Sequence, residues 1–473
     1  MQAERYWPLL LPLPLLLWPA LLNGYPIVFS DTGTYLSQAI HLYLGWDRPA
    51  FYSVFMMVLH LTLTTWPVVL VQAACVVLML DCVRGAFFPA MPRILLPLVL
   101  MAMALLTGLP WLISRLMPDL FTPLLVLALA VLIFVPERLG TRERWVLALA
   151  AAAMMAVHQS NILLSFGLLL FLLPLRRMLG ARMALGRADV LRLALIPALA
   201  LAALTAVNFA AHRIASPSPF GNVFLLARVI YDGPGLRALQ RECPRADWRL
   251  CAELDRFPPT SDDFLWLADG PLIRAGGAKV ISREATAIIL AAVLAEPWTQ
   301  LRAVVANTVA QLGRFSPGDG LHAWPETVSP WIVRDFPAFE RQSYEAARQT
   351  QGALVMPSWI EAADRASVVF GSVALAFVLV RALRRRCPSA GLCTAVFLAV
   401  LGNAVITGGL STPHDRYQSR VVWLPAAMVL LALPGGRMLA DLRGARGAVL
   451  RGARGAVGDA ILLRPSIRSR AYA

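Results

Sequence analysis

The sequence predicts an all-helical protein that crosses a membrane many times. Hydrophobic residues make up 58% of its 473 positions, and charged residues only 15%. Apolar runs recur from the first row to the last third of the chain, and a run of about 20 residues can span the hydrocarbon core as a helix. A soluble chain of this length would instead divide into domains with charged surfaces. We therefore expect an all-α polytopic membrane protein.

Ten apolar segments are predicted to be membrane spans, with twelve as the alternative count. The alternative arises at 50–84, which is too long for one ordinary span and is interrupted by Trp66 and Pro67. This segment is either one kinked helix or a span with re-entrant pieces. The ten segments are 9–22, 50–84, 94–111, 118–135, 145–158, 161–175, 192–211, 366–381, 389–408 and 420–435.

Arginines gather at the ends of these segments. They cluster in the connections 136–144, 176–192 and 382–388, which all fall on one side of the membrane on a ten-span count. Because positive loops mark the cytoplasmic side, both termini are expected inside and the loop at 25–49 outside. The net charge of +15 therefore indicates membrane lipids, and not nucleic acid, as the partner of the arginines. The expected location is the bacterial cytoplasmic (inner) membrane, with the active face extracytoplasmic.

The chain divides into four parts on this topology. An N-terminal transmembrane module is followed by an extracytoplasmic region, by further transmembrane helices and by a basic cytoplasmic tail. Their boundaries are 1–211, 212–365, 366–435 and 436–473. In the extracytoplasmic region, Leu301, Val304, Val305 and Val309 recur at helical spacing. This pattern favours either a helix on the membrane surface or a helix packed within the region.

Two cysteines lie close together in the extracytoplasmic region. In an oxidising compartment, the spacing of Cys243 and Cys251 suggests a disulfide that closes a short loop. A metal pair is the alternative, but no histidine lies nearby. The sequence also has no His-x-x-x-His cluster and no phosphate-binding glycine loop.

The first outer loop carries charge next to the membrane. Asp31, Asp47 and Arg48 lie there among several aromatic residues, and charge at such a boundary is costly and seldom without function. Simpler interpretations are that Asp31 caps a helix and that Asp47 and Arg48 form an interfacial ion pair.

Polar residues later in the chain are further candidates for a site. His158 interrupts an apolar segment, where it either lines a pocket or packs between helices. Arg416 and Arg420 are four residues apart and share a helix face if helical, although they can also anchor lipid headgroups. His414 either assists at the same face or is a plain loop histidine.

Four of these stretches resemble motifs of the GT-C superfamily, the polytopic glycosyltransferases that include protein mannosyltransferases and aminoarabinose–lipid A transferases. The similar stretches are 30–35 (Ser-Asp-Thr-Gly-Thr-Tyr), 47–52 (Asp-Arg-Pro-Ala-Phe-Tyr), 117–122 (Met-Pro-Asp-Leu-Phe-Thr) and 414–420 (His-Asp-Arg-Tyr-Gln-Ser-Arg). The resemblance implies a GT-C-like bundle of about ten transmembrane helices with an extracytoplasmic helical region. It also implies a polyprenyl-phosphate-linked sugar as donor and a lipid, glycan or protein as acceptor.

The resemblance assigns roles to the charged residues. Asp31 is the candidate base, because partial burial raises the pKa of a carboxylate. Asp47 is a second base, a metal ligand or the partner of Arg48. A divalent cation stays open, because Thr32 follows Asp31 where many family members have a second acidic residue. The residues expected to bind substrate are Arg48, Tyr35, Tyr52, His158, His414, Arg416, Tyr417 and Arg420.

Two other function classes are compatible with the sequence. A lipid or polysaccharide transporter or flippase would show paired, interrupted spans in corresponding halves, and no convincing internal repeat is present. A membrane acyltransferase is the other alternative.

Overall fold

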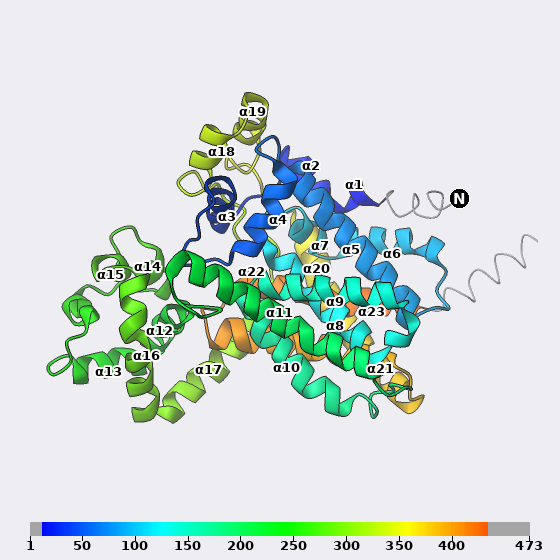
Figure 1. Cartoon of the computed structure of the whole chain (residues 1–473). Helices are drawn as coiled ribbons and strands as arrows, with labels where there is room; N and C mark the ends of the chain where they lie inside the picture. Colours follow the sequence, from blue (N-terminus) through cyan, green and yellow to red (C-terminus); the bar gives the residue numbers. More distant parts are fainter. Residues whose placement is uncertain (1–11, 434–473) are drawn as a thin grey trace, which may run out of the picture.

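The computed structural model describes residues 12–433, and this part of the chain is built from helices (Figure 1). Within the described range, the one strand-like pairing is an isolated bridge between Ile27 and Arg115. The prediction of an all-helical protein is therefore confirmed for these residues. The basic tail predicted at 436–473 lies outside them.

Four of the described helices are long and apolar enough to cross a membrane. They are α5 (Trp66–Phe87), α11 (Arg187–His212), α20 (Ser358–Arg384) and α21 with its π-helical end η7 (Ser389–Gly409). Shorter apolar helices occupy several other predicted spans. These four helices support a membrane protein, whereas the count of ten spans stays a prediction.

The other helices of the bundle are shorter. They are α1 (Leu13–Leu16), α2 (Trp18–Asn23), α4 (Ala50–His60), α6 (Leu96–Leu106), α7 (Leu109–Ile113), α8 (Phe121–Phe134), α9 (Thr141–Ala156), α10 (Gln159–Leu175), α22 (Asp415–Val422) and α23 (Leu424–Ala432). Short 3₁₀ turns connect some of them, namely η3 (Arg93–Leu95), η4 (Pro118–Leu120) and η5 (Pro136–Arg138).

Two predicted spans differ from the observed helices. The segment 50–84 forms two separate helices, α4 and α5, because the chain turns at Leu61 and Thr62, which both have positive φ. The described part of 9–22 contains two short helices, α1 and α2, which meet at Leu17. The prolines in this stretch explain the interruption, since proline cannot donate a backbone hydrogen bond within a helix.

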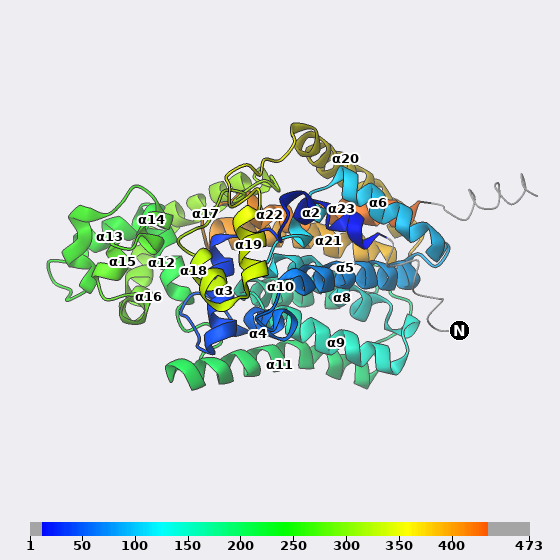
Figure 2. The ribbon, with the colours of Figure 1, turned by 90° about the horizontal axis from the view of Figure 1, so that it is seen from above.

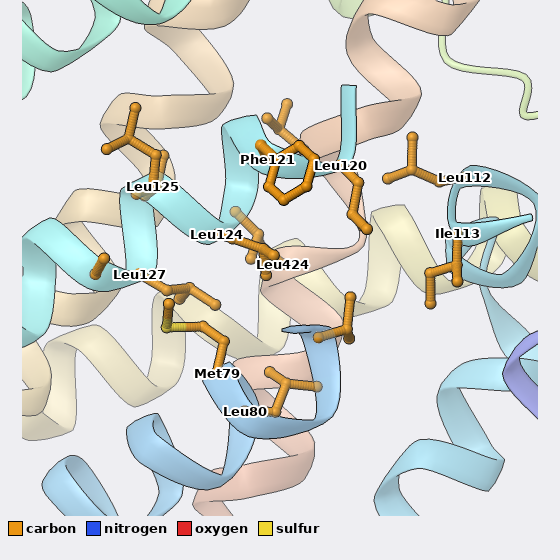
Figure 3. Packing of buried hydrophobic residues seen from close by; sticks show 14 of the residues in the cluster. Met79, Leu80, Leu112, Ile113, Leu120, Phe121, Leu124, Leu125, Leu127 and Leu424 are labelled. Carbon is orange, nitrogen blue, oxygen red and sulfur yellow. The ribbon is translucent and has the colours of Figure 1, made fainter. Parts of the chain in front are cut away.

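Helix α8 is the centre of the bundle. Every residue from Phe121 to Phe134 is buried, as expected for a helix that is apolar on all sides. Figure 3 shows its side chains packed beside those of α5, α7 and α23; the labelled residues are Met79, Leu80, Leu112, Ile113, Leu120, Phe121, Leu124, Leu125, Leu127 and Leu424. Helix α21 also approaches closely: a Cβ at Gly391 would lie 2.3 Å from the Phe134 ring.

The arginine-rich connections meet at one end of the bundle. Arg144 forms an ion pair with Asp189 at 3.3 Å, and the guanidinium of Arg176 donates a hydrogen bond to the carbonyl of Ile133 at 3.1 Å. The first turn of α21, which follows the connection after α20, joins them, since the Gly391 amide donates to the Leu179 carbonyl. The outer helices lie at the opposite end (Figures 1 and 2).

The outer helices come from two parts of the chain, the first outer loop and the region after α11. They are α3 (Ser30–His41), α12 (Gly221–Tyr231), α13 (Pro234–Glu242), η6 (Arg249–Arg256), α14 (Ser261–Trp266), α15 (Pro271–Arg274), α16 (Ala278–Ala295), α17 (Pro297–Leu312), α18 (Ser329–Asp335) and α19 (Ala338–Ala346). Helices α12 to α16 share a small hydrophobic core of their own, which includes Leu226, Phe264 and Ile281.

The structure joins Cys243 to Cys251 in a disulfide, as the sequence predicts. This bond closes a short loop between α13 and η6.

Replacing both cysteines with serine is expected to destabilise this region by roughly 2–3 kcal/mol, because the unfolded loop gains conformational freedom. Limited proteolysis should then cut near 243–251 faster than in the unaltered protein. Equal cleavage rates would contradict the prediction; the control pair Cys75→Ser and Cys82→Ser removes two free thiols of the bundle.

Candidate functional site

A carboxylate held between two arginines lies where the outer helices meet the bundle. Asp31, in the first turn of α3, accepts a hydrogen bond from Arg48 at 2.7 Å on one oxygen and from Arg416 at 3.0 Å on the other. Arg48 precedes α4, and Arg416 lies in the first turn of α22. The first outer loop and the last part of the chain, 385 residues apart, thus meet at one carboxylate.

Aromatic rings support both arginines. The Arg48 guanidinium lies 5.4 Å from the centre of the Trp266 ring, and the Arg416 guanidinium lies 4.1 Å from that of Phe29 and 4.8 Å from that of Tyr417. Rings at these distances stabilise a cation and restrict where it can move. Both guanidiniums are therefore preorganised around Asp31.

Asp31 is ionised in this arrangement. Burial raises the pKa of its carboxyl, but the charges of Arg48 and Arg416 and their hydrogen bonds outweigh burial, so the pKa lies well below its usual range. The expectation that partial burial leaves Asp31 with a raised pKa is therefore wrong. The cause is the pair of arginines.

Of the two aspartates in the first outer loop, Asp47 is the one with a raised pKa. Burial is the largest cause, and the negative charge of Asp31 adds to it, whereas Arg48 acts in the opposite direction. Its closest polar side-chain contact is the Thr34 hydroxyl, at 3.5 Å. Among the described residues it has no ion pair, since Arg48 donates to its backbone carbonyl and not to its carboxylate.

Sequence reasoning missed the residues that hold α22 in place. The carboxylate of Asp319 accepts from the Arg416 amide at 3.1 Å, and Asp415 accepts from the Ser316 amide at 2.8 Å. The buried Arg115 donates to the backbone carbonyl of Asp319 at 2.7 Å. The glycines that flank Asp319 were the one available sign of a special turn there.

Arg420 is fully buried and lies in a separate hydrogen-bond network. Its guanidinium donates to Asp119 at 3.1 Å, to Asn403 at 2.9 and 2.7 Å, and to the Ser160 hydroxyl at 2.9 Å. With its donors used inside the protein, Arg420 ties α22 to α21, η4 and α10. Arg416 and Arg420 therefore bind different carboxylates, Asp31 and Asp119, although they are four residues apart.

The remaining candidates are two tyrosines and two histidines. Tyr35 and Tyr52 are buried and pack against each other with their rings 4.9 Å apart, so they join α3 to α4. His158 lies at the start of α10, where its ring nitrogen Nδ1 is 2.8 Å from the Ser160 hydroxyl. His414 lies 3.0 Å from the carboxylate of Asp262.

Two cavities adjoin at the arginines. The first, of about 510 Å³, lies over α3, and we call it the polar cavity because of the charged side chains in its wall. Four carboxylates contribute to its wall, together with His322, His414 and Trp324; they are Asp31, Asp47, Asp262 and Asp319.

The second cavity, of about 520 Å³, lies between α10, α12 and η7. Its lining mixes the apolar side chains of Ile162, Leu163, Leu225, Ile406 and Leu410 with polar ones, which include His158, Gln159, Asn222 and Thr407. We call it the apolar cavity because apolar atoms form a larger share of its wall than in the first cavity. Both cavities share one wall, formed by Arg48, Phe224, Ser411, Arg416 and Tyr417. A single ligand with a polar and an apolar part can thus lie across the arginines.

The described residues contain no group of three histidine, cysteine, aspartate or glutamate side chains placed to hold a metal ion. Asp31 already accepts from two arginines, which leaves Asp47 as the freer oxygen ligand. The divalent cation considered from the sequence has no further support.

Comparison with known proteins adds no relative to these observations. No family model, no curated protein and no solved structure matches the chain.

Proposed function

We propose that the protein is a membrane glycosyltransferase that moves a sugar from a polyprenyl-phosphate donor to an acceptor on the extracytoplasmic face. The observation that carries the proposal is that a cavity lined by four aspartates meets a more apolar cavity at Arg48 and Arg416. The donor has the same three parts in the same order: an apolar chain, a phosphate and a sugar. The arginine fork suits the phosphate, since it pairs with two oxygens and keeps its charge.

The reaction can be written with these residues. The acceptor oxygen attacks the anomeric carbon of the sugar in the polar cavity as the bond between that carbon and the phosphate oxygen breaks. The polyprenyl phosphate leaves with the electron pair, and Arg48 and Arg416 stabilise its charge. The acceptor proton goes to a carboxylate. Transfer from the face opposite the phosphate inverts the anomeric centre.

Asp47 suits the proton-accepting role better than Asp31. A base takes a proton more readily when its pKa is closer to the working pH, and burial raises the pKa of Asp47. Asp31 has a lowered pKa and both oxygens bonded to arginine. We therefore assign Asp31 to positioning the two arginines, which changes the role expected from the sequence.

The pH dependence of transfer separates the two carboxylates. The base must be ionised, so the rate should fall as pH drops through the pKa of Asp47, above the ordinary aspartate value of about 4. Asp47→Asn should lower kcat by about 10²–10⁴-fold and remove this fall in rate at low pH, which we call the acid limb of the pH profile. Asp31→Asn should lower the rate but keep the limb. An acid limb that persists in Asp47→Asn and vanishes in Asp31→Asn would reverse the assignment.

The proposed orientation follows from the arginine-rich connections at the opposite end of the bundle. If these connections are cytoplasmic, both cavities open outside. The same proposal includes ten spans and a multi-pass position in the bacterial inner membrane. A membrane-impermeant thiol reagent on intact cells should then label Thr327→Cys, an exposed residue of the polar cavity, and not Arg182→Cys, in the connection after α10.

The function itself is tested on lipids of cells that lack the protein. Mass spectrometry should show one polyprenyl-phosphate sugar accumulating, and the wild-type gene should reverse this. Arg416→Ala should not reverse it, whereas Arg365→Ala, which changes an exposed residue of α20, should. No accumulation would contradict the proposal and favour a lipid or polysaccharide flippase or an acyltransferase, which an apolar cavity beside a polar one also suits.

A further inference from the structure

The polar side chains of helix α17 face the protein and its apolar side chains face outward, which is the reverse of a helix at the surface of a water-soluble region. Its amide side chains face the protein: Gln311 is fully buried and Gln300 nearly so. Gln300 and Asn307 donate hydrogen bonds to Asp232, at 2.8 and 3.0 Å. Apolar side chains occupy the outward face; they are Trp298, Leu301, Val305, Val309 and Leu312.

The apolar face continues onto the preceding helix. Leu290 and Leu294 of α16 are exposed, Leu294 to 78%, and Trp298 next to them in α17 is 80% exposed. We call this set, from Leu290 to Leu312, the α16–α17 stripe. Contiguous apolar side chains of this size are rare on a surface that meets water, and their exposure to water is unfavourable by about 25 cal/mol per Å².

Helix α17 packs directly against the end of a membrane-crossing helix. A Cβ at Gly408 would lie 2.6 Å from the carbonyl oxygen of Asn307, and a Cβ at Gly409 would lie 2.9 Å from the side chain of Val304. Both glycines belong to η7, the last turn of the span Ser389–Gly409. Both views place α17 between the outer helices and the bundle (Figures 1 and 2). The stripe thus lies on a helix that adjoins the end of a span.

We infer that the α16–α17 stripe is embedded in the outer leaflet of the membrane, at the level of the lipid headgroups and upper acyl chains. Tryptophan is enriched at this depth, which suits Trp298. Cations on the exposed faces of the same helices, Lys279, Arg283 and Arg302, lie where lipid phosphates would meet them. The phosphates of a lipid surface would supply the negative charge that pairs with these cations.

The embedded helix also holds one wall of the polar cavity. Gln311 exchanges two hydrogen bonds with the backbone of His414, at 2.8 and 3.0 Å, and Arg314 donates to the carbonyl of Pro413 at 2.9 Å. The chain then enters α22, which carries Arg416. Contact with lipid therefore fixes the height of Arg416 above the membrane.

Spin labelling of the full-length protein in vesicles of phosphatidylcholine and phosphatidylglycerol tests this inference without reference to the proposed function. The four free cysteines, Cys75, Cys82, Cys387 and Cys393, are first replaced with serine, and a nitroxide is attached at Val305→Cys. Val373→Cys, on the exposed face of the span α20, is the lipid control, and Gln342→Cys, exposed on α19, is the water control.

The readout is the collision rate of each nitroxide with oxygen, which concentrates in lipid, and with a water-soluble nickel chelate. We expect the label at Val305 to collide with oxygen at least several-fold more often than with the chelate, as at Val373. A preference for the chelate, as at Gln342, would overturn the inference. Protection from both reagents would also overturn it, because it would mean that protein covers the stripe.

Discussion

Replacing Arg416 with alanine is expected to lower the rate of sugar transfer by about 10²–10³-fold. Arg416 is one of two guanidiniums aimed at the junction of the two cavities, and loss of one preorganised donor to a developing negative charge has an effect of this size. The loss should appear mainly in kcat, since the charge develops as the phosphate leaves. Transfer measured with the purified protein in lipid vesicles checks this.

The controls separate charge from folding. Arg416→Lys keeps one charge but loses the planar fork, so its rate should lie between those of the alanine variant and the wild type. Arg365→Ala removes an exposed arginine of α20 and should leave the rate unchanged. An Arg416→Ala protein that inserts normally and keeps its rate within two-fold would remove Arg416 from the site.

Breaking the buried pair of Arg420 and Asp119 is expected to destabilise the protein by about 3–5 kcal/mol. The Arg420 side chain is fully buried, so Arg420→Ala leaves Asp119 as a buried charge with one fewer partner and leaves a cavity. The midpoint of thermal unfolding in detergent should fall clearly. Unfolding of a protein this size is not two-state, so the midpoint and not a free energy is the measured quantity.

A double-variant cycle identifies the cause. Arg420→Met with Asp119→Leu removes both charges, and it should lower the midpoint less than either single change does. The exposed pair of Arg365 and Glu361 is the matched control; its loss should change stability by at most about 1 kcal/mol. If the double variant loses as much as the sum of the singles, the buried charge is not the cause.

Part of the site could be predicted from the sequence. Asp31 and Arg48 were singled out because charge near a membrane is costly, and Arg416 because of its spacing from Arg420 and the motif-like stretch around it. The structure brings Asp31, Arg48 and Arg416 together. The predicted direction of the shift in the Asp31 pKa was wrong. Local sequence does not show that two arginines, one of them hundreds of residues away, bond to the same carboxylate. Arg420 shows the same limit. A four-residue spacing places two side chains near each other on α22, but their partners come from α3 in one case and from η4 and α21 in the other.

The fold was predictable in class and less so in its divisions. Composition alone indicates helices in a membrane, because lipid leaves backbone groups no other partners. The sequence indicated the break between α4 and α5 through Trp66 and Pro67, which lie in the first turn of α5. It did not indicate the turn itself, because Leu61 and Thr62 have positive φ, a conformation that neither residue type favours. The sequence also did not indicate that Phe29 and Trp266 contact the arginines, because aromatic residues are common at membrane boundaries in any case.

The separation of Asp31 and Arg416 along the chain has a consequence for biosynthesis. Arg48 follows Asp31 by 17 residues and Arg416 by 385. At roughly 5–20 residues per second, a ribosome needs about 20–80 seconds to make the chain between Asp31 and Arg416. During that interval Arg48 alone can neutralise Asp31, while the spans between them enter the membrane. The guanidinium of Arg416 can therefore reach Asp31 only after the final helices are made. A chain truncated before α22 would have Arg48 at Asp31 but not Arg416.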